Sequence, residues 1–139
     1  MNEIQYMRNA PASNAALNVL FAQAWPGPHT DWDFGPTHAR GMGYFCAFDG
    51  DDLVGYVNLA WDGGVHTFLL DPTVRPDYQR RGIGRTLVRH AEELARQNGA
   101  EWLHVDFDPQ LESFYRGCGF VATLAGLINL TETGRSPGS

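Results

Sequence analysis

The sequence predicts one α/β domain, and three features of the chain support this fold class. Strand-like segments joined by turn residues fill residues 44–74, an amphipathic helical segment follows over residues 84–97, and a loop rich in glycine and arginine connects the two. Apolar residues make up 43% of the 139-residue chain, which is enough for one compact core. Since no repeat or linker divides the sequence, residues 1–139 are expected to form a single domain.

The first part of the chain combines a strand, a helix and a long loop. Residues Glu3–Met7 are expected to form a short strand, and Ser13 is a good N-cap for a helix after it. That helix should stop at Trp25, because Pro26 disfavours helical geometry in the residue before it. Residues 26–43 are rich in Pro, Gly, His and aromatic side chains, which predicts a loop with room for a short helix. Loops of this length are usually functional or mobile.

The rest of the chain has clear turn and helix signals. The segment Asp49-Gly50-Asp51-Asp52 separates two strand candidates and predicts a hairpin, and Gly99 supplies a helix stop. One apolar stripe of the central helix is formed by Leu87, Val88, Ala91, Leu94 and Ala95. The expected elements are strands at Tyr44–Phe48, Leu53–Trp61, His66–Val74 and Trp102–Phe107, helices at Gly84–Gln97 and Leu111–Arg116, closing strands at Val121 and Leu127–Leu130, and a frayed tail over residues 131–139.

Charge and hydropathy disfavour several classes of protein. The net charge of −6 argues against a nucleic-acid-binding protein, because such proteins usually present a basic face. No apolar run approaches the roughly 18–20 residues that cross a bilayer, and residues 1–8 lack the pattern of a signal peptide. We therefore expect a cytoplasmic protein with no nucleic-acid or membrane partner. Cys46 and Cys118 are expected to be reduced thiols, and the histidines show no metal-ligand spacing, so no metal is expected.

The most informative segment is Val74–Gly84, between a predicted strand and the strongest predicted helix. The N-terminus of a helix presents unpaired N–H groups and the positive end of its dipole, and glycines let the backbone approach an anion closely. Arg80, Arg81 and Arg85 add positive charge, and Thr86 adds a hydroxyl donor. The segment has neither the Walker pattern nor the Rossmann glycine pattern. On these features alone, a phosphate site and a tight, basic connection both stay open.

Two motifs sharpen this interpretation. Val-x-Pro is followed by Gln-Arg-Arg-Gly-Ile-Gly at residues 79–84, and further along the chain stands Phe-Tyr-Arg-Gly-Cys-Gly-Phe at residues 114–120. The first resembles the pattern Gln/Arg-x-x-Gly-x-Gly/Ala, and the second resembles the segment Leu-Tyr-x-x-x-Gly-Phe, of the GNAT superfamily of acetyl-CoA-dependent N-acetyltransferases. The clear match covers residues 68–120. It implies a GNAT-like fold, in which a central mixed, mostly antiparallel sheet is flanked by helices and residues 66–120 form the core motif region.

The resemblance implies acetyl-CoA as the acetyl donor. The strand end at residues 72–74 would pair by its backbone with the pantetheine arm, like an added β-strand, and main-chain N–H groups of residues 80–85 would wrap the pyrophosphate. Many relatives have Asn at the position of Asp108 and Ala at that of Leu111, and a carboxylate cannot donate the hydrogen bond that an amide donates. The implied cofactor-binding residues are Pro72, Thr73, Val74, Gln79, Arg80, Arg81, Gly82, Ile83, Gly84, Arg85, Thr86, Asp108 and Phe114.

The resemblance also implies the reacting groups. Tyr115 matches the usual general acid of the family, which protonates the leaving thiolate of CoA, and a phenol with an ordinary pKa of about 10 stays protonated at neutral pH. The general base varies in position. Asp71 and His104 are the leading candidates, Asp106 lies on the same face of the expected strand as His104, and a water chain is a fourth. Each has a structural alternative, such as a bend at Asp71 before Pro72.

The loop after the first helix is expected to line the acceptor pocket. Aromatic faces and carboxylates suit an organic cation. The alternative is that these aromatic side chains only close the core beneath a long loop. The predicted substrate-binding residues are Trp25, Trp32, Phe34 and His38, with Asp31 and Asp33 beside them.

These features together predict an N-acetyltransferase that moves an acetyl group from acetyl-CoA to a small-molecule or peptide primary amine, directly and in a ternary complex. A covalent route through Cys118 would need a paired base, and the sequence shows none. One alternative is a non-catalytic acyl-CoA sensor or regulatory module of the same fold, against which Tyr115 argues. Another is a domain that binds a different phosphate-bearing ligand through the same loop. The family often pairs through its C-terminal strands, so a homodimer is also compatible with the resemblance.

Overall fold

The computed structural model describes residues 3–131, which form two compact units, one ending at Val105 and the other beginning at Asp106. The smaller unit contains the turn η2 (Pro109–Leu111), the helix α4 (Glu112–Gly117) and irregular chain after it. The elements of the larger unit are β1 (Gln5–Arg8), α1 (Asn14–Ala24), α2 (Gly35–Arg40), β2 (Gly43–Asp49), β3 (Asp52–Trp61), β4 (His66–Val74), the 3₁₀ turn η1 (Pro76–Tyr78), α3 (Ile83–Gln97) and β5 (Trp102–His104).

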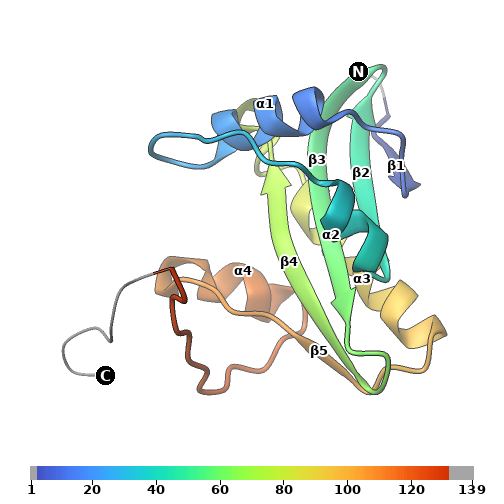
Figure 1. The fold of residues 1–139 in the computed structure, drawn as a ribbon, viewed down its shortest axis with the longest axis vertical. Coiled ribbons are helices and arrows are strands. Elements are labelled where there is room, and N and C mark those ends of the chain that lie inside the picture. The colour runs from blue at the N-terminus through green and yellow to red at the C-terminus, as the bar shows by residue number, and fades with distance from the viewer. Residues whose placement is uncertain (1–2, 132–139) are drawn as a thin grey trace. The chain divides into compact units, whose positions relative to one another are not determined.

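The larger unit is built on an open five-stranded sheet with the strand order β1-β2-β3-β4-β5. Neighbouring strands are antiparallel except β4 and β5, which are parallel because the chain crosses between them through α3. In Figure 1, α1 and α2 lie on one face of the sheet and α3 on the other. The sheet is therefore mixed and mostly antiparallel, and the predicted fold class is confirmed.

Helix α3 packs its apolar stripe on the sheet, as the spacing of its residues predicts. Its five stripe residues are all buried, together with Ile83 in the first turn. Gly55 on β3 allows this close approach, because a Cβ there would lie 3.0 Å from Leu87 and 3.2 Å from Ile83. The side chains in the first half of α3 therefore pack directly against the backbone of β3 at Gly55.

The opposite face of the sheet is covered by α1 and by the residues that lead into α2. Leu17 and Leu20 of α1 are fully buried in a cluster that also contains Phe34, Cys46 and Tyr56. Burial raises the pKa of the Cys46 thiol to about 12, so this cysteine is expected to be a neutral packing residue. The long loop after α1 includes the short helix α2, as the sequence allowed.

Two expectations about the C-terminal part are wrong. Strand β5 ends at His104 rather than at Phe107, and the strands expected at Val121 and Leu127–Leu130 do not form. A strand needs a hydrogen-bonded neighbour, and residues 121–130 have no ladder partner in the described chain. The large apolar side chains of this segment, Val121, Leu124, Leu127, Ile128 and Leu130, are 80–104% exposed. The predicted frayed tail lies, from residue 132 onward, outside the described residues.

The substitution Gly55→Val is expected to lower the free energy of unfolding by about 1–3 kcal/mol, because the new side chain must displace α3 from the sheet. Urea denaturation followed by circular dichroism measures this change. Gly126→Val is the matched control, since a Cβ at Gly126 meets no atom within 4 Å. Equal stability of the two variants would contradict the close packing of α3 on β3.

Candidate active site

Strand β4 is interrupted by a bulge at the position of a predicted catalytic residue. The pairs Tyr56↔Thr73 and Asn58↔Leu70 leave two residues of β4, Asp71 and Pro72, opposite one residue of β3. Asp71 has a φ of 52°, in the left-handed region that side chains seldom adopt. A bulge also tolerates a proline, which cannot donate a ladder hydrogen bond. Asp71 therefore does shape a bend, and its carboxylate is exposed there.

One edge of β4 is open beyond the end of its ladder with β5. The parallel ladder to β5 ends at the pair Phe68↔His104, whereas β4 runs on to Val74. Within the described chain, no strand pairs with residues 69–74 on the side of β5. The predicted pantetheine-binding residues 72–74 lie on this free edge, where an extended ligand can add to the sheet through its amide groups.

The loop between β4 and α3 places backbone N–H groups at the start of the helix. Arg80 and Gly82 both have left-handed backbones, with φ of 64° and 82°. Gly82 is the N-cap of α3 and offers no side-chain cap, and the first turn contains no acidic residue. The N–H groups of that turn therefore keep their capacity to bind an anion.

Three arginines surround this helix start without forming direct ion pairs in the described chain. Arg80, Arg81 and Arg85 form no ion pair with any carboxylate among residues 3–131. Their charge stands out in a chain whose net charge is −6. Local charge and the helix dipole thus both favour a phosphate at this place.

Tyr78 organises the approach to this loop. Its ring lies between the guanidinium groups of Arg75 and Arg81, each 4.7 Å from the ring centroid. Its hydroxyl donates to the carboxylate of Asp49 at the end of β2, and this hydrogen bond is the main cause that raises the pKa of Tyr78. Arg75 is also bonded to Asp77 at 2.8 Å. Arg81 is therefore held by a ring contact, which leaves its charge available.

Two predicted cofactor residues use their side chains within the loop. The hydroxyl of Thr86 donates to the carbonyl of Gly82 at 2.9 Å, and the amide of Gln79 donates to the carbonyl of Val74 at 3.1 Å. Both bonds shape the turn from β4 into α3. In this structure, the loop's capacity for an anion rests on its main chain and arginines more than on the Thr86 hydroxyl.

The loop between α1 and α2 is tied to α1 by two asparagines. Asn18, which is buried, donates to the carbonyl of Trp32 at 2.8 Å and accepts from the backbone N–H of Trp32 at 2.8 Å. Its side-chain oxygen also lies 3.0 Å from Nε2 of His29. Asn14 accepts from the backbone N–H of Phe34 and donates to Asp33, each at 3.0 Å. The loop therefore has a defined course, which the sequence did not reveal.

The four predicted acceptor-site residues have different positions. Trp25 donates its indole N–H to the hydroxyl of Thr73 at 3.0 Å, so the end of α1 is joined to the bulged part of β4. The side chain of Trp32 is exposed. Phe34 is buried, as the core-packing alternative expects, and packs edge-on against Tyr56. His38 lies beside Phe34, on α2, and is partly exposed.

Tyr56 is a candidate site residue that sequence reasoning missed. It is 1% exposed, and its hydroxyl shares a hydrogen bond of 2.8 Å with Nε2 of His38. The His38 ring also stacks on Tyr44 with 3.6 Å between centroids. Burial lowers the pKa of His38, and burial followed by the charge of Asp71 raises the pKa of Tyr56 well above its ordinary value. The only signal for Tyr56 in the sequence was its place on a strand beside the cofactor strand.

Asn58, two residues along β3 on the same face, has a polar atom without a partner. It is 2% exposed, and no hydrogen bond reaches its Oδ1 within the described part of the chain. This oxygen lies 3.2 Å from the Cβ position of Gly41, just after α2. An unsatisfied acceptor in such a place costs stability unless water or a ligand supplies a donor.

The two base candidates on and after β5 are separated by the end of the strand. His104 shares a hydrogen bond of 2.8 Å with Nδ1 of His66 and stacks on Phe68 at 4.8 Å. Asp106 follows the end of β5 and belongs to the smaller unit. The expectation that Asp106 shares a strand face with His104 is therefore wrong.

The smaller unit places Tyr115 in an aromatic cluster. Tyr115 is 5% exposed and stacks on Phe107 at 4.8 Å. Phe114 and Phe120 both approach its ring edge-on. Asp108 is exposed at the residue before η2. The second sequence motif thus forms a local structure around the tyrosine ring, which fixes the direction of its side chain within that unit.

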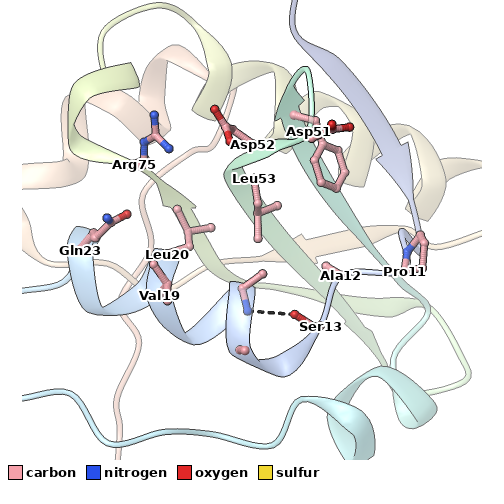
Figure 2. A pocket seen from close by; sticks show the side chains of 13 residues that line it. Pro11, Ala12, Ser13, Val19, Leu20, Gln23, Asp51, Asp52, Leu53 and Arg75 are labelled. Atoms are coloured by element: carbon pink, nitrogen blue, oxygen red, sulfur yellow. Dashed lines mark hydrogen bonds between the residues drawn. The ribbon is translucent and has the colours of Figure 1, made fainter.

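A groove of about 580 Å³ lies elsewhere on the larger unit, between α1 and the turn from β2 to β3 (Figure 2). Its charged residues are Asp51, Asp52 and Arg75, and the last of these is paired with Asp77. None of the predicted cofactor-binding or substrate-binding residues lines this groove. It is lined by Pro11, Ala12, Ser13, Ala15, Ala16, Val19, Leu20, Gln23, Phe48, Asp51, Asp52, Leu53 and Arg75.

Two general properties follow from the described residues. No helix among them is long and apolar enough to span a membrane. No group of three or more His, Cys, Asp or Glu side chains within residues 3–131 is placed to hold a metal ion.

Comparison with known proteins identifies the family. The profile of the Acetyltransferase (GNAT) family matches residues 11–120, and the chain belongs to this family. An uncharacterized N-acetyltransferase, ycf52 of Pyropia yezoensis, is 28% identical over 69 residues, which are 50% of this chain and 40% of the relative. The N-alpha-acetyltransferase RimI of Mycobacterium tuberculosis is 34% identical over 105 residues, or 69% of this chain and 61% of that protein. The chain thus matches less than two thirds of either relative.

Solved structures share the fold at low identity. A probable acetyltransferase of unknown function, SA2161 from meticillin-resistant Staphylococcus aureus, superposes with a TM-score of 0.80 and 18% identity, covering 94% of this chain and all of that one. The aminoglycoside N-acetyltransferase AAC(6')-Iy in complex with CoA superposes with a TM-score of 0.76 and 17% identity, covering 96% and 97%. These likenesses confirm the GNAT-like fold.

Replacement of Asn18 by Ala is expected to destabilise the protein by about 1–3 kcal/mol, because backbone groups of the loop lose their buried partner. Hydrogen exchange should also become faster in residues 29–34. Chemical denaturation and exchange mass spectrometry measure the two effects. Gln23→Ala, at an exposed position of α1, is the control, and a similar small effect of both variants would argue against the anchoring role of Asn18.

Proposed function

We propose that this chain is an N-acetyltransferase that moves an acetyl group from acetyl-CoA to a primary amine by direct transfer in a ternary complex. The observation that carries this proposal is the start of α3. There, an N-cap glycine with φ of 82°, a first turn without acids and three unpaired arginines meet at one place. The family membership and the names of the relatives, several of which are called N-acetyltransferases, agree with this chemistry.

Different residues of the chain would bind successive parts of acetyl-CoA. The main chain of residues 80–85 would bind the pyrophosphate, and the free edge of β4 would pair with the pantetheine amides. The thioester would then come close to the bulge at Asp71. The neighbour AAC(6')-Iy was solved with CoA, which supports the same donor for a chain of this fold.

Primary amines are the acceptors that the candidate site suits best. An amine is a cation in solution, and the loop after α1 offers the exposed ring of Trp32 and the exposed carboxylates of Asp31 and Asp33. The relatives include an N-alpha-acetyltransferase and an aminoglycoside N-acetyltransferase, so amines of peptides and of small molecules both belong in a first screen.

In this reaction the amine nitrogen attacks the carbonyl carbon of the thioester, the carbon–sulfur bond breaks, and the thiolate takes a proton. Tyr115 would donate that proton as general acid. The aromatic rings packed around Tyr115 hold its phenol ring in one orientation. Asp71 and His104 stay the proposed groups for the opposite proton transfer, in which the acceptor ammonium is deprotonated before the attack.

The substitution Gly82→Ala is expected to raise the Kd of acetyl-CoA at least tenfold, because the added Cβ would keep the phosphate away from the backbone N–H groups, and each lost N–H bond to phosphate is worth about 1.5–3 kcal/mol. Calorimetric titration with acetyl-CoA, CoA, ATP and NADH measures this. Gly99→Ala is the matched control: Gly99 has the same φ of 82° at the other end of α3, so both variants carry the same strain of about 1–2 kcal/mol. If neither CoA species binds to the unaltered protein, the proposed donor is wrong.

Acceptors can be found by following CoA release with a thiol reagent in the presence of spermidine, kanamycin or a short peptide with a free N-terminus. Turnover with at least one amine is expected, and Tyr115→Phe should lower kcat by about 100-fold or more while leaving the Kd of acetyl-CoA nearly unchanged. Phe107→Leu is a control for packing around the tyrosine ring. Tight acetyl-CoA binding without turnover on a wider amine panel would favour the sensor function instead.

A further inference from the structure

The contact between α2 and β3 joins two groups that can exchange a proton. Oη of Tyr56 and Nε2 of His38 are 2.8 Å apart, which is a short and well-formed hydrogen bond. Tyr56 is buried and is packed edge-on against Phe21 and Phe34. The Tyr56 end of this bond therefore lies in a dry environment, where a proton transfer partner is held in one position.

One end of this pair faces the bulge of β4. Tyr56 is the ladder partner of Thr73, two residues after Asp71. The Asp71 carboxylate is close enough to contribute to the raised pKa of Tyr56, so the phenol stays protonated at neutral pH. The other end of the pair, His38, is half-buried on α2 and has a path to water.

His38 is in the state that can receive a proton. Burial lowers its pKa below the ordinary value, so its imidazole is neutral at pH 7 and one ring nitrogen is an acceptor. The bond to a protonated phenol assigns that role to Nε2, which requires the Nδ1–H tautomer.

We propose that Tyr56 and His38 form a proton relay that carries the proton of the acceptor ammonium away from the bulge at Asp71. The relay rests on the proposed acetyl transfer and specifies its base side. Asp71 receives the proton from the ammonium group and passes it to Oη of Tyr56, while Tyr56 passes its own hydroxyl proton to Nε2 of His38. Asp71 and Tyr56 end in their starting forms, and the imidazolium of His38 then releases a proton to water.

Few other ionisable groups face the pair. On β2 they are Tyr44, whose ring stacks on His38, and Cys46, whose burial keeps it neutral. On β4 the group is Asp71, and α1 contributes the apolar ring of Phe21. The hydroxyl of Tyr44 donates to the carbonyl of Ala10 and so lies outside the relay. Tyr44→Phe therefore removes a phenol from the same cluster without breaking the path.

The tautomer of His38 can be measured without any acceptor amine, and it tests the relay. In protein labelled with ¹⁵N-histidine, the ring shifts of the unaltered chain at pH 7 should be those of the Nδ1–H form, and Tyr56→Phe should abolish this preference. Tyr44→Phe should retain it. An Nε2–H form in the unaltered protein would overturn the relay, because Nε2 could not then accept the proton of Tyr56.

The pH dependence of turnover tests the function of the relay. With the best of spermidine, kanamycin and the N-terminal peptide, kcat/KM of the unaltered chain should level off above the His38 pKa measured by the same NMR titration. His38→Gln and Tyr56→Phe should each lower kcat/KM at pH 7 by about 100-fold or more. The remaining activity of these two variants should rise about tenfold per pH unit, because they could use only amine that is already deprotonated in solution. Tyr44→Phe should keep the rate within a few-fold and leave the profile unchanged.

The outcomes separate the relay from the proposed function. Turnover that depends on Tyr115, with equal rates and profiles for His38→Gln and Tyr44→Phe, would overturn the relay alone and leave the bond between Tyr56 and His38 a packing contact. Absence of acetyl-CoA binding would overturn the proposed function, and the catalytic part of the relay with it. The expected tautomer together with the two altered profiles would support both.

Discussion

Strand β4 pairs with two different strands, β3 and β5, and the candidate site depends on how these two pairings differ. It pairs in parallel with β5 only as far as Phe68, and it stays paired with β3 to Val74 by inserting a bulge at Asp71. Beyond Phe68, the other edge of β4 has main-chain groups without a partner strand in the described chain. It also brings Thr73 within hydrogen-bond distance of Trp25, so that the end of α1 is attached to the same point. The end of α1 and the bulged part of β4 are therefore held together by one side-chain hydrogen bond.

The distribution of charge gives the site two different ends. The chain is acidic overall, but its uncompensated arginines gather where α3 begins, and its aromatic and acidic loop residues lie beyond α1. An anionic group and a cationic group would thus be drawn to different places on the larger unit. Tyr78 contributes to this arrangement, because its ring contacts the guanidinium groups of Arg75 and Arg81, and Arg75 is also paired with Asp77.

Local patterns in the sequence predicted much of the fold, and long-range contacts account for what they missed. The stripe of α3, the cap at Ser13 and the glycine-rich loop depend on neighbours in sequence, so their spacing was informative. The closing strands at residues 121–130 had suitable residues but needed a hydrogen-bonded neighbour, which no local pattern reveals. The role of Asn18 and the bond between Tyr56 and His38 join residues 14 and 18 positions apart, respectively, and only the folded chain brings them together.

The two asparagines that anchor the loop affect how the sequence of this protein can change during evolution. Asn18 holds the loop at Trp32 through the main chain of that residue, and Asn14 holds it at Phe34 in the same way. Position 32, whose side chain is exposed, would therefore accept a different side chain without losing these hydrogen bonds, whereas the ring of Phe34 is also held by core packing. The exposed surface of this loop could then change through single substitutions, while the start of α3 and the sheet stay under separate selection. Such a separation would let the loop surface vary while the rest of the larger unit stays constant.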